Sequence, residues 1–359
     1  MTPALLTNDA LPRLALDEWR AAGCHDTPSG LTPVSFVPGQ RLRLQSGQVL
    51  RGAALTLPSL KSVFGNGTQG GAYGYKWGDG WIDIEGATNW LIEDCVFDFG
   101  AAGRYSHEAE VGYNAINVRG GASQGVIRRC TFKNVDSALF LRSCHHLTVE
   151  DCTVVQTRKS WQPDPTDRTG HYGVLLSTAD HCLVSRLNIQ GRLMHDVSVQ
   201  NASYNVIEDA TGVDLNFDHH RKNPHHNLFT GCNVGLGTRV YASSGNVSDG
   251  TNNGDWECFW GNYKADGSQV SVLPNFQNGY WTKRLVIIGQ TQDSRTANAE
   301  WYENIPSDQL VPRNLYRHLV GATPPPPPPP PPFDGKADAR ERLRNLGWPE
   351  ATIDAVVNP

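Results

Sequence analysis

The chain has 359 residues, a formal net charge of −5 and a pI near 6.2, a mildly acidic balance that argues against a general nucleic-acid-binding protein. Hydrophobic residues make up 39% of the sequence, which is enough for a sizeable core, yet no apolar run approaches the length of a membrane-spanning helix. The 36 glycines and the many short apolar runs favour a β-rich chain with frequent turns.

The first predicted element is a short helix at 8–23, "NDALPRLALDEWRAAG". We expect it to cap the first coil of the repeat fold, within a region of cap and first strands over 1–49. The N-terminus lacks a basic start followed by an apolar stretch, so no secretory signal peptide is visible. A secreted protein would therefore require that its signal had been removed.

A repeat of about 22 residues follows. Its clearest copies are "LIEDCVF" (91–97), "VIRRCTF" (126–132) and "TVEDCTV" (148–154). Its aligned apolar positions are Ile92, Ile127, Val149, Val184, Ile207 and Phe229. Short alternating strands such as "AINVR" (115–119) lie between them. This period predicts an all-β fold, a right-handed parallel β-helix over 50–322.

Two features of the repeat bear on its interior and its edge. Four cysteines fall at the same place in their coils, and their simplest interpretation is a stack of buried thiols rather than disulfides: Cys95, Cys130, Cys152 and Cys232. Two polar insertions, at 99–112 and 157–170, fall at the same turn of their coils. Loops stacked in this way are expected to wall one side of a binding groove.

The C-terminal part reads differently from the repeat. A run of prolines predicts an extended linker over 323–335. The residues after it, 336–359, predict a small helical tail of two short helices separated at "GWPE".

The stretch "DLNFDHHRKNPHHNLF" at 214–229 is the densest in titratable groups. Counting back equally from Ile207 and Phe229 predicts that Asp196 and Asp218 stack on successive coils, about 4.8 Å apart. Alternation directs His220 outward with them. Stacked carboxylates repel, so they need a shared proton, a cation between them or nearby positive groups.

Either positively charged side chains or a metal ion could offset the repulsion between these carboxylates. The positive groups expected from the same and neighbouring coils are Arg119, Arg142, His171, His195, His219, Arg221, Lys222 and Arg239. Calcium held by Asp196, Asp214 or Asp218 is the favoured metal, because carboxylates supply hard oxygen ligands. The adjacent histidine pairs of "HHRKNPHH" lack the spacing and the cysteines of a structural zinc site.

With a coil repeat over about 50–320 and acidic and basic groups on one strand column, the chain resembles the right-handed β-helix carbohydrate-active enzymes. This broad group contains pectate-lyase-like lyases and polygalacturonase-like hydrolases, and "HD" (195–196), "DHH" (218–220) and "HHNLF" (225–229) are loosely similar to its strings. The resemblance implies a secreted enzyme that cleaves a polysaccharide, with neither nucleic acid nor membrane as partner. It leaves the oligomeric state open.

Two chemistries fit the site residues, and the local excess of basic groups favours a lyase that cleaves an acidic polysaccharide by β-elimination. Its predicted catalytic residues are Asp196, Asp218, His219, His220, Arg221 and Arg239. Its predicted substrate-binding residues are Arg119, Arg142, His171, His195, Asp214 and Lys222. The alternative is a glycoside hydrolase that pairs Asp218 with Asp196 or Asp214.

A third possibility is a β-helix that only binds glycans. Its sugar-stacking platforms would be Trp256, Trp260, Trp281 and Trp301. Packing of these tryptophans in the C-terminal part of the core is the favoured interpretation.

Overall fold

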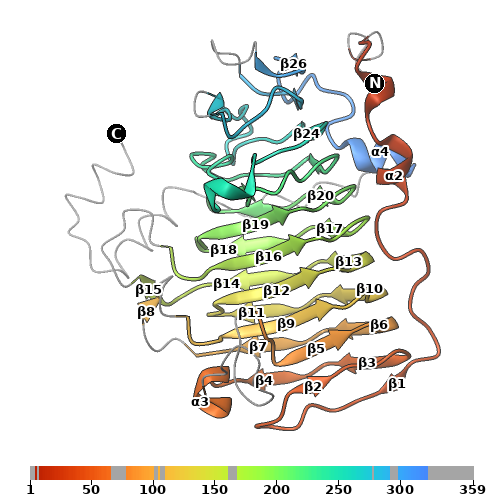
Figure 1. The fold of residues 1–359 in the computed structure, drawn as a ribbon, viewed down its shortest axis with the longest axis vertical. Helices are drawn as coiled ribbons and strands as arrows, with labels where there is room; N and C mark the ends of the chain where they lie inside the picture. Colours follow the sequence, from red (N-terminus) through yellow and green to blue (C-terminus); the bar gives the residue numbers. More distant parts are fainter. Residues whose placement is uncertain are drawn as a thin grey trace. The chain divides into compact units, whose positions relative to one another are not determined.

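Short strands stack in parallel in three sheets, as Figure 1 shows for this computed structural model. The structure describes residues 5, 8–65, 78–100, 104–105, 110–160, 168–276, 279–291 and 298–321. The chain divides into two units, 1–320 and 321–359. The predicted linker at 323–335 and the tail at 336–359 lie outside the described residues. No helix of the described part is long and apolar enough to cross a membrane.

Three sheets run along the stack, and each is given in its spatial order. The eleven-stranded sheet contains β1 (Thr32–Pro33), β3 (Gln48–Arg51), β6 (Thr88–Glu93), β10 (Ser123–Arg128), β13 (His145–Glu150), β17 (Leu183–Ser185), β20 (Val206–Glu208), β23 (Leu228–Thr230), β24 (Glu257–Trp260), β25 (Leu285–Ile288) and β26 (Trp301–Glu303). The six-stranded sheet contains β21 (Thr211–Gly212), β18 (Asn188–Gln190), β14 (Thr153–Val155), β11 (Thr131–Lys133), β7 (Val96–Asp98) and β4 (Ala54–Thr56). The seven-stranded sheet contains β2 (Leu42–Arg43), β5 (Ile82–Glu85), β9 (Asn114–Arg119), β12 (Ser137–Arg142), β16 (Tyr172–Ser177), β19 (His195–Gln200) and β22 (Phe217–His219).

The predicted fold is confirmed: the chain is a right-handed parallel β-helix. All six aligned positions of the repeat pair in register in the eleven-stranded sheet, from Ile92 against Ile127 to Ile207 against Phe229. These side chains are buried in one core that runs through the coils. The four aligned cysteines are buried and unpaired, so the thiol stack is confirmed as well.

A single residue with positive φ turns the chain from the eleven-stranded to the six-stranded sheet. It is Asp94 after β6, Arg129 after β10, Asp151 after β13 and Arg186 after β17. The charges alternate along this corner, and Arg129 pairs with Asp94 at 2.7 Å while Arg186 pairs with Asp151 at 2.6 Å. The corner residues thereby form ion pairs between coils outside the core.

The N-terminal segment is helical, but the predicted cap of the first coil is wrong in position. A 3₁₀ turn, η1 (Leu11–Arg13), and a short helix, α2 (Leu16–Arg20), lie against the outer face of the eleven-stranded sheet, far along the stack (Figure 1). Trp19 is buried there and its Nε1 donates to the carbonyl of His226 at 2.6 Å. Helix α4 (Leu315–Leu319) covers the same face. The physical reason is that Val206, Leu228 and other outward apolar residues of this sheet need cover.

Three of the four tryptophans proposed as sugar platforms are buried, namely Trp260, Trp281 and Trp301. Trp260 and Trp301 pack under the N-terminal segment and α4, and Trp281 belongs to the inner core. Trp256 is half-buried, with Arg13 over its ring. The packing interpretation is therefore correct for the three buried side chains.

The described parts of the two insertions pair with each other. They follow β7 and β14, and each contributes a short strand, β8 (Arg104–Tyr105) and β15 (Lys159–Ser160), which pair in parallel. Their described ends are fixed by Arg158, which pairs with Asp136 at 3.1 Å in a fully buried position. The described residues also form α3 (Leu60–Phe64) and a 3₁₀ turn, η3 (Val247–Asp249).

Candidate functional site

The outer face of the seven-stranded sheet changes character along the stack. Asp83, Asn117, Phe140, Leu175, Ser198 and Asp218 lie level with one another on successive strands. They run from polar groups at one end, over two apolar side chains, to Ser198 and Asp218 at the other. Asp218 lies on β22, the last strand of this sheet. The sheet therefore ends in a carboxylate that faces outward.

Two histidines and two serines surround the Asp218 carboxylate, which is fully buried. Its Oδ2 accepts from the Ser198 hydroxyl at 2.6 Å and lies 3.1 Å from His220 Nδ1 and 3.3 Å from His195 Nδ1. Its Oδ1 accepts from the backbone N–H of Ser244 at 3.0 Å. We call His195, Asp218 and His220 the outer triad. His220 is its accessible member, with 24% of its side chain exposed.

The electrostatics of Asp218 follow from these partners. Burial raises the pKa of an aspartate, but His195, His220 and the Ser198 hydroxyl outweigh it and lower the pKa of Asp218 to about 2. The carboxylate is thus held ionised although no solvent reaches it.

Aromatic rings line the outer triad on the side of the previous coils. The Tyr172 ring is stacked on the His171 ring with centroids 3.9 Å apart, and it lies 5.3 Å from the His195 ring. His171 Nδ1 contacts the carboxylate of Glu110, at the end of the first insertion. Burial, with Asp218 and Glu110 nearby, raises the pKa of the Tyr172 phenol well above its ordinary value. The first insertion therefore reaches the site through Glu110.

A second cluster lies beside the outer triad, around Arg239. Its Nη2 donates to Asp196 Oδ2 at 2.6 Å, its Nε donates to the Asp214 carbonyl at 2.9 Å, and its Nη1 donates to the Met194 carbonyl at 3.2 Å. Asp196 also accepts from the backbone N–H groups of Leu193 and Asn216. Burial raises the pKa of Asp196 although Arg239 opposes it.

These contacts bear on the calcium expectation. The positive charge near Asp196 and Asp214 comes from arginines, because Arg239 is shared by both and Arg192 Nη2 lies 3.6 Å from Asp214. Thr238 donates to Asp214 through both its backbone N–H and its hydroxyl. The contacts around Arg239 thus stabilise the local structure, and they do not form the all-oxygen ligand set that calcium prefers.

The predicted stack of Asp196 on Asp218 is wrong by two residues. Asp218 lies level with Ser198, and Val197 lies level with Phe217. The reason is that single turns vary in length even where the spacing of the aligned positions Val184, Ile207 and Phe229 is nearly constant. The turn before β22 is shorter than in the preceding coil, and the turn after it is longer, through Arg221, Lys222 and Asn223, which all have positive φ.

His219 lies on the opposite side of β22 from the outer triad, inside the core. It is fully buried among the rings of Phe229, Phe259 and Trp281, and its Nε2 lies 2.9 Å from Glu257 Oε1. A catalytic role for His219 in contact with substrate is therefore wrong. Strand alternation is the cause, since Phe217 and His219 share the inner face.

The other predicted basic residues occupy different places. Arg142 and Arg119 lie on the same outer face, several coils away from the outer triad. Burial and the neighbouring Arg119 lower the pKa of the Arg142 guanidinium. Arg221 is buried, donates to the carbonyls of Gly245 and Gly250 and lies over the Tyr280 ring, so it positions a loop. Lys222 is exposed.

Sequence reasoning brought His171, His195, Asp218 and His220 to one place but missed Tyr172 and Ser244. Tyr172 follows His171 directly at the start of β16, and this adjacency was the available signal. Ser244 belongs to an irregular segment, 238–245, which carries no repeat pattern. That segment folds over the exposed edge of β22, and Asn216 Nδ2 holds it by donating to the Arg239 and Ala242 carbonyls.

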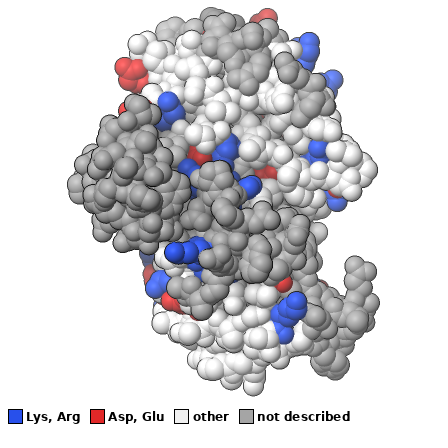
Figure 2. Space-filling model, turned by 90° about the vertical axis from the view of Figure 1, so that its left-hand side faces the viewer, with Lys and Arg blue, Asp and Glu red and all other residues white. Residues whose placement is uncertain are grey.

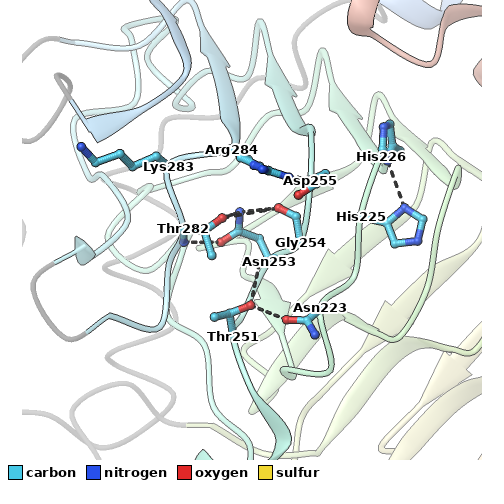
Figure 3. A pocket seen from close by; sticks show the side chains of 10 residues that line it. All are labelled: Asn223, His225, His226, Thr251, Asn253, Gly254, Asp255, Thr282, Lys283 and Arg284. Atoms are coloured by element: carbon cyan, nitrogen blue, oxygen red, sulfur yellow. Dashed lines mark hydrogen bonds and ion pairs between the residues drawn. The ribbon is translucent and has the colours of Figure 1, made fainter.

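Basic side chains gather near the middle of the face that Figure 2 presents, beside a few acidic ones. A separate hollow of about 610 Å³ lies at the turns before β23 and β24, and Figure 3 shows its lining. His225 and His226 lie on one side of it and Lys283 on the other. Arg284 is paired with Asp255 at 2.6 Å, and His225 and His226 face each other through Nδ1 atoms 3.0 Å apart. We call this hollow the second hollow, because it is a second candidate site apart from the outer triad. The residues that line it are mostly of polar types.

No protein-family model, no curated protein and no solved structure matches this chain. The parallel β-helix is thus the class that the structure defines, and function has to be argued from the site.

Proposed function

We propose that this protein cleaves an acidic polysaccharide by β-elimination on the outer face of the seven-stranded sheet. The observation that carries the proposal is the hydrogen-bonded contact of His220 with buried Asp218 on a face that also presents Arg119 and Arg142. Such an enzyme would meet its polymer outside the cell.

His220 is the general base of this proposal. A carboxylate that accepts from imidazole Nδ1 fixes the tautomer in which Nε2 is free to take a proton. His220 is also the accessible member of the outer triad. In the reaction, Nε2 removes the proton on the carbon next to the uronate carboxylate, a carbon–carbon double bond forms, and the bond to the leaving oxygen breaks. A proton donor is needed at that oxygen, and we assign this role to the Tyr172 phenol, whose ring lies 6.5 Å from the His220 ring.

Arg119 and Arg142 are the substrate-binding groups of the proposal. The two guanidinium groups are close enough for their like charges to interact. Arg142 donates to the Asn117 side chain at 2.9 Å and lies over the Phe140 ring. Adjacent guanidinium groups on a partly buried surface favour an anionic ligand between or above them. A polymer that lies along the stack would meet these arginines several coils from His220.

The test incubates the purified chain with a panel of acidic polysaccharides. It follows the ultraviolet absorbance of unsaturated uronates and the appearance of reducing ends. We expect both signals to rise, to fall by about 10²–10⁴-fold in His220→Gln, and to persist in the matched control His225→Gln, whose imidazole lies in the second hollow. Silence on every polymer, with retained binding to one of them, would instead favour the glycan-binding alternative.

A glycoside hydrolase is the second candidate, because Asp196 and Asp218 are outward carboxylates on neighbouring strands, β19 and β22. Retaining and inverting hydrolases both use two carboxyl groups. New reducing ends without the absorbance of an unsaturated sugar would favour this candidate and contradict elimination. The oxygens of Asp196 already accept from Arg239 and two backbone N–H groups, which favours the lyase.

A further inference from the structure

We propose that the outer triad is a binding site for a divalent transition-metal ion of the zinc class. The site deepens the proposed function, because it involves the same His220, but its evidence is independent of any activity. His195, Asp218 and His220 each offer one ligand atom, and these atoms all lie within 4.8 Å of one another.

Two of the three distances between these atoms match those in a tetrahedral ion, and the third lies within 4.8 Å. Zinc binds imidazole nitrogen and carboxylate oxygen at about 2.0–2.2 Å, so two ligands of a tetrahedral ion lie about 3.3–3.5 Å apart. Asp218 Oδ2 lies 3.3 Å from His195 Nδ1 and 3.1 Å from His220 Nδ1. An ion between the three atoms would need small side-chain shifts and no change of the strands.

The donor set selects the class of metal. Two imidazoles and one carboxylate suit zinc, iron, cobalt or nickel, whereas calcium and magnesium prefer oxygen ligands. Three protein ligands leave a further position open, as in catalytic rather than structural zinc sites. The two histidines come from different coils, on β19 and directly after β22. For this reason a search for metal motifs along the sequence does not find the site.

Charge compensation points the same way. Among the described residues, the basic partners of Asp218 are His195 and His220, which carry a positive charge only when protonated. Asp196 and Asp214, which are equally buried, are instead paired with arginines. A buried carboxylate needs a compensating positive charge. A divalent cation would supply at Asp218 what guanidinium groups supply at the two other aspartates.

The surroundings of the triad would also hold its ligands in place. The Ser198 hydroxyl and the Ser244 backbone N–H fix the two oxygens of Asp218. The Ser244 hydroxyl lies 3.3 Å from His195 Nε2, the nitrogen of that ring that would not bind the ion. A hydrogen bond to a metal-binding side chain orients that side chain and raises the affinity of the site for the metal.

An ion at the outer triad would also affect the proposed elimination. A neutral imidazole that gives its Nδ1 lone pair to a metal carries its proton on Nε2. His220 then has no free nitrogen with which to remove a proton. Zinc at the outer triad would therefore inhibit β-elimination, and a chelator would restore or raise the activity.

The first test measures binding alone. The full-length chain is freed of metal with a chelator, and Zn²⁺ is titrated in competition with a chromophoric chelator. Co²⁺ serves as a second probe, since a tetrahedral site with nitrogen ligands gives strong visible absorption. We expect one ion to bind, with affinity at least about tenfold lower in His195→Gln and in His220→Gln. Ca²⁺ at the same concentration is expected not to compete.

Two controls separate the outer triad from other histidines. His225→Gln and His226→Gln alter the histidine pair of the second hollow and are expected to leave the affinity unchanged. Circular dichroism and thermal unfolding establish that each variant folds. Unchanged affinity in both outer-triad variants, loss of binding in the control variants, or displacement of zinc by Ca²⁺ would each overturn the inference.

Failure of the inference and failure of the proposed function give different results. If zinc does not bind while unsaturated uronates form, the metal inference falls and the lyase stands. If zinc binds through His195 and His220 while no acidic polymer is cleaved, the proposed lyase falls and the metal site stands.

Discussion

Two carboxylate–imidazole pairs lie on opposite sides of one strand end. Glu257 and His219 form the inner pair, in which both side chains are fully buried. Asp218 and His220 form the outer pair, in which the carboxylate is fully buried but the imidazole is partly exposed. The same two kinds of group are therefore presented once to the core and once to solvent.

The difference lies in what else each carboxylate does. Glu257 also accepts from the backbone N–H and the side-chain amide of Asn227, which continue a buried amide ladder to Asn205. Both oxygens of Glu257 are held by these buried partners, so the inner pair fixes structure. The outer pair ends at solvent through His220, so it can exchange a proton or a ligand. The two pairs contain the same kinds of group, so their different roles follow from their surroundings.

The largest effect is expected from removal of the inner carboxylate. Glu257→Ala leaves the Asn227 donors and the buried His219 ring without their acceptor. We expect a loss of about 3–5 kcal/mol in the free energy of unfolding, because breaking a buried hydrogen-bonded ionic pair leaves uncompensated groups. Urea unfolding measures it. Glu85→Ala, at a side chain that is 63% exposed, is the control, and equal effects of the two changes would contradict the comparison.

The outer pair should show the opposite balance between activity and stability. Asp218→Asn keeps the shape of the side chain but removes the carboxylate that orients His220. We expect elimination to slow by about 10²–10⁴-fold. The loss of stability is expected to stay below that of Glu257→Ala. Initial rates and urea unfolding of the same preparations measure both. Full activity in Asp218→Asn would refute the role of the outer pair.

A third imidazole environment gives a smaller, pH-dependent effect. The pKa of His146 is lowered from its ordinary 6.5, first by burial and then by the charges of His25 and His181, whose rings lie on either side. The unfolded chain then binds the proton more readily than the folded one. Stability from this group is therefore present above pH 6.5 and is lost as the pH falls toward the lowered pKa.

Melting temperatures of the wild type and of His146→Asn between neutral and mildly acidic pH measure this effect. Asparagine tolerates the positive φ of this position, 51°. We expect the variant to lose less stability on acidification than the wild type. Parallel pH curves would show that His146 does not contribute.

The smallest effect is expected at the charged corner outside the core. Asp151→Asn removes one ion pair with Arg186 and keeps a residue that accepts positive φ. Exposed ion pairs contribute about 0.2–1 kcal/mol, so the shift in the urea midpoint should be slight and should shrink in high salt. A loss as large as that of Glu257→Ala would mean that the corner, and not the interior, holds the coils together.

The fold could be predicted from the sequence because every coil repeats one constraint. Ile127, Val149 and their equivalents must fill the same interior layer, so their spacing measures the coil directly. The same constraint predicted the buried thiols. The position of the N-terminal helix carried no such signal, because the outer apolar residues that it covers, such as Val206 and Leu228, read as ordinary strand residues.

The site was predicted in part, for a related reason. Alternation placed Asp218 and His220 outward correctly, since it acts within one strand. The pairing of Asp196 with Asp218 depended on equal turn lengths, and the turns on either side of β22 depart from the repeat in opposite directions. Ser244 could not be predicted at all, because an irregular segment has no partner coil from which to count.

The position of Asp218 on the last strand of its sheet has a consequence for how this protein could change over time. Strands in the middle of the stack are paired on both sides, so changes of length there are confined to turns, as in the insertions at 99–112 and 157–170. The segment 238–245 covers a free edge and is held by Asn216 and Asp218, by the pairing of Arg239 with Asp196, and by the buried side chains Val240 and Tyr241. Its exposed positions, such as Ala242, can change while these contacts stay intact, so new ligand preferences can arise at this end of the sheet without rebuilding a coil.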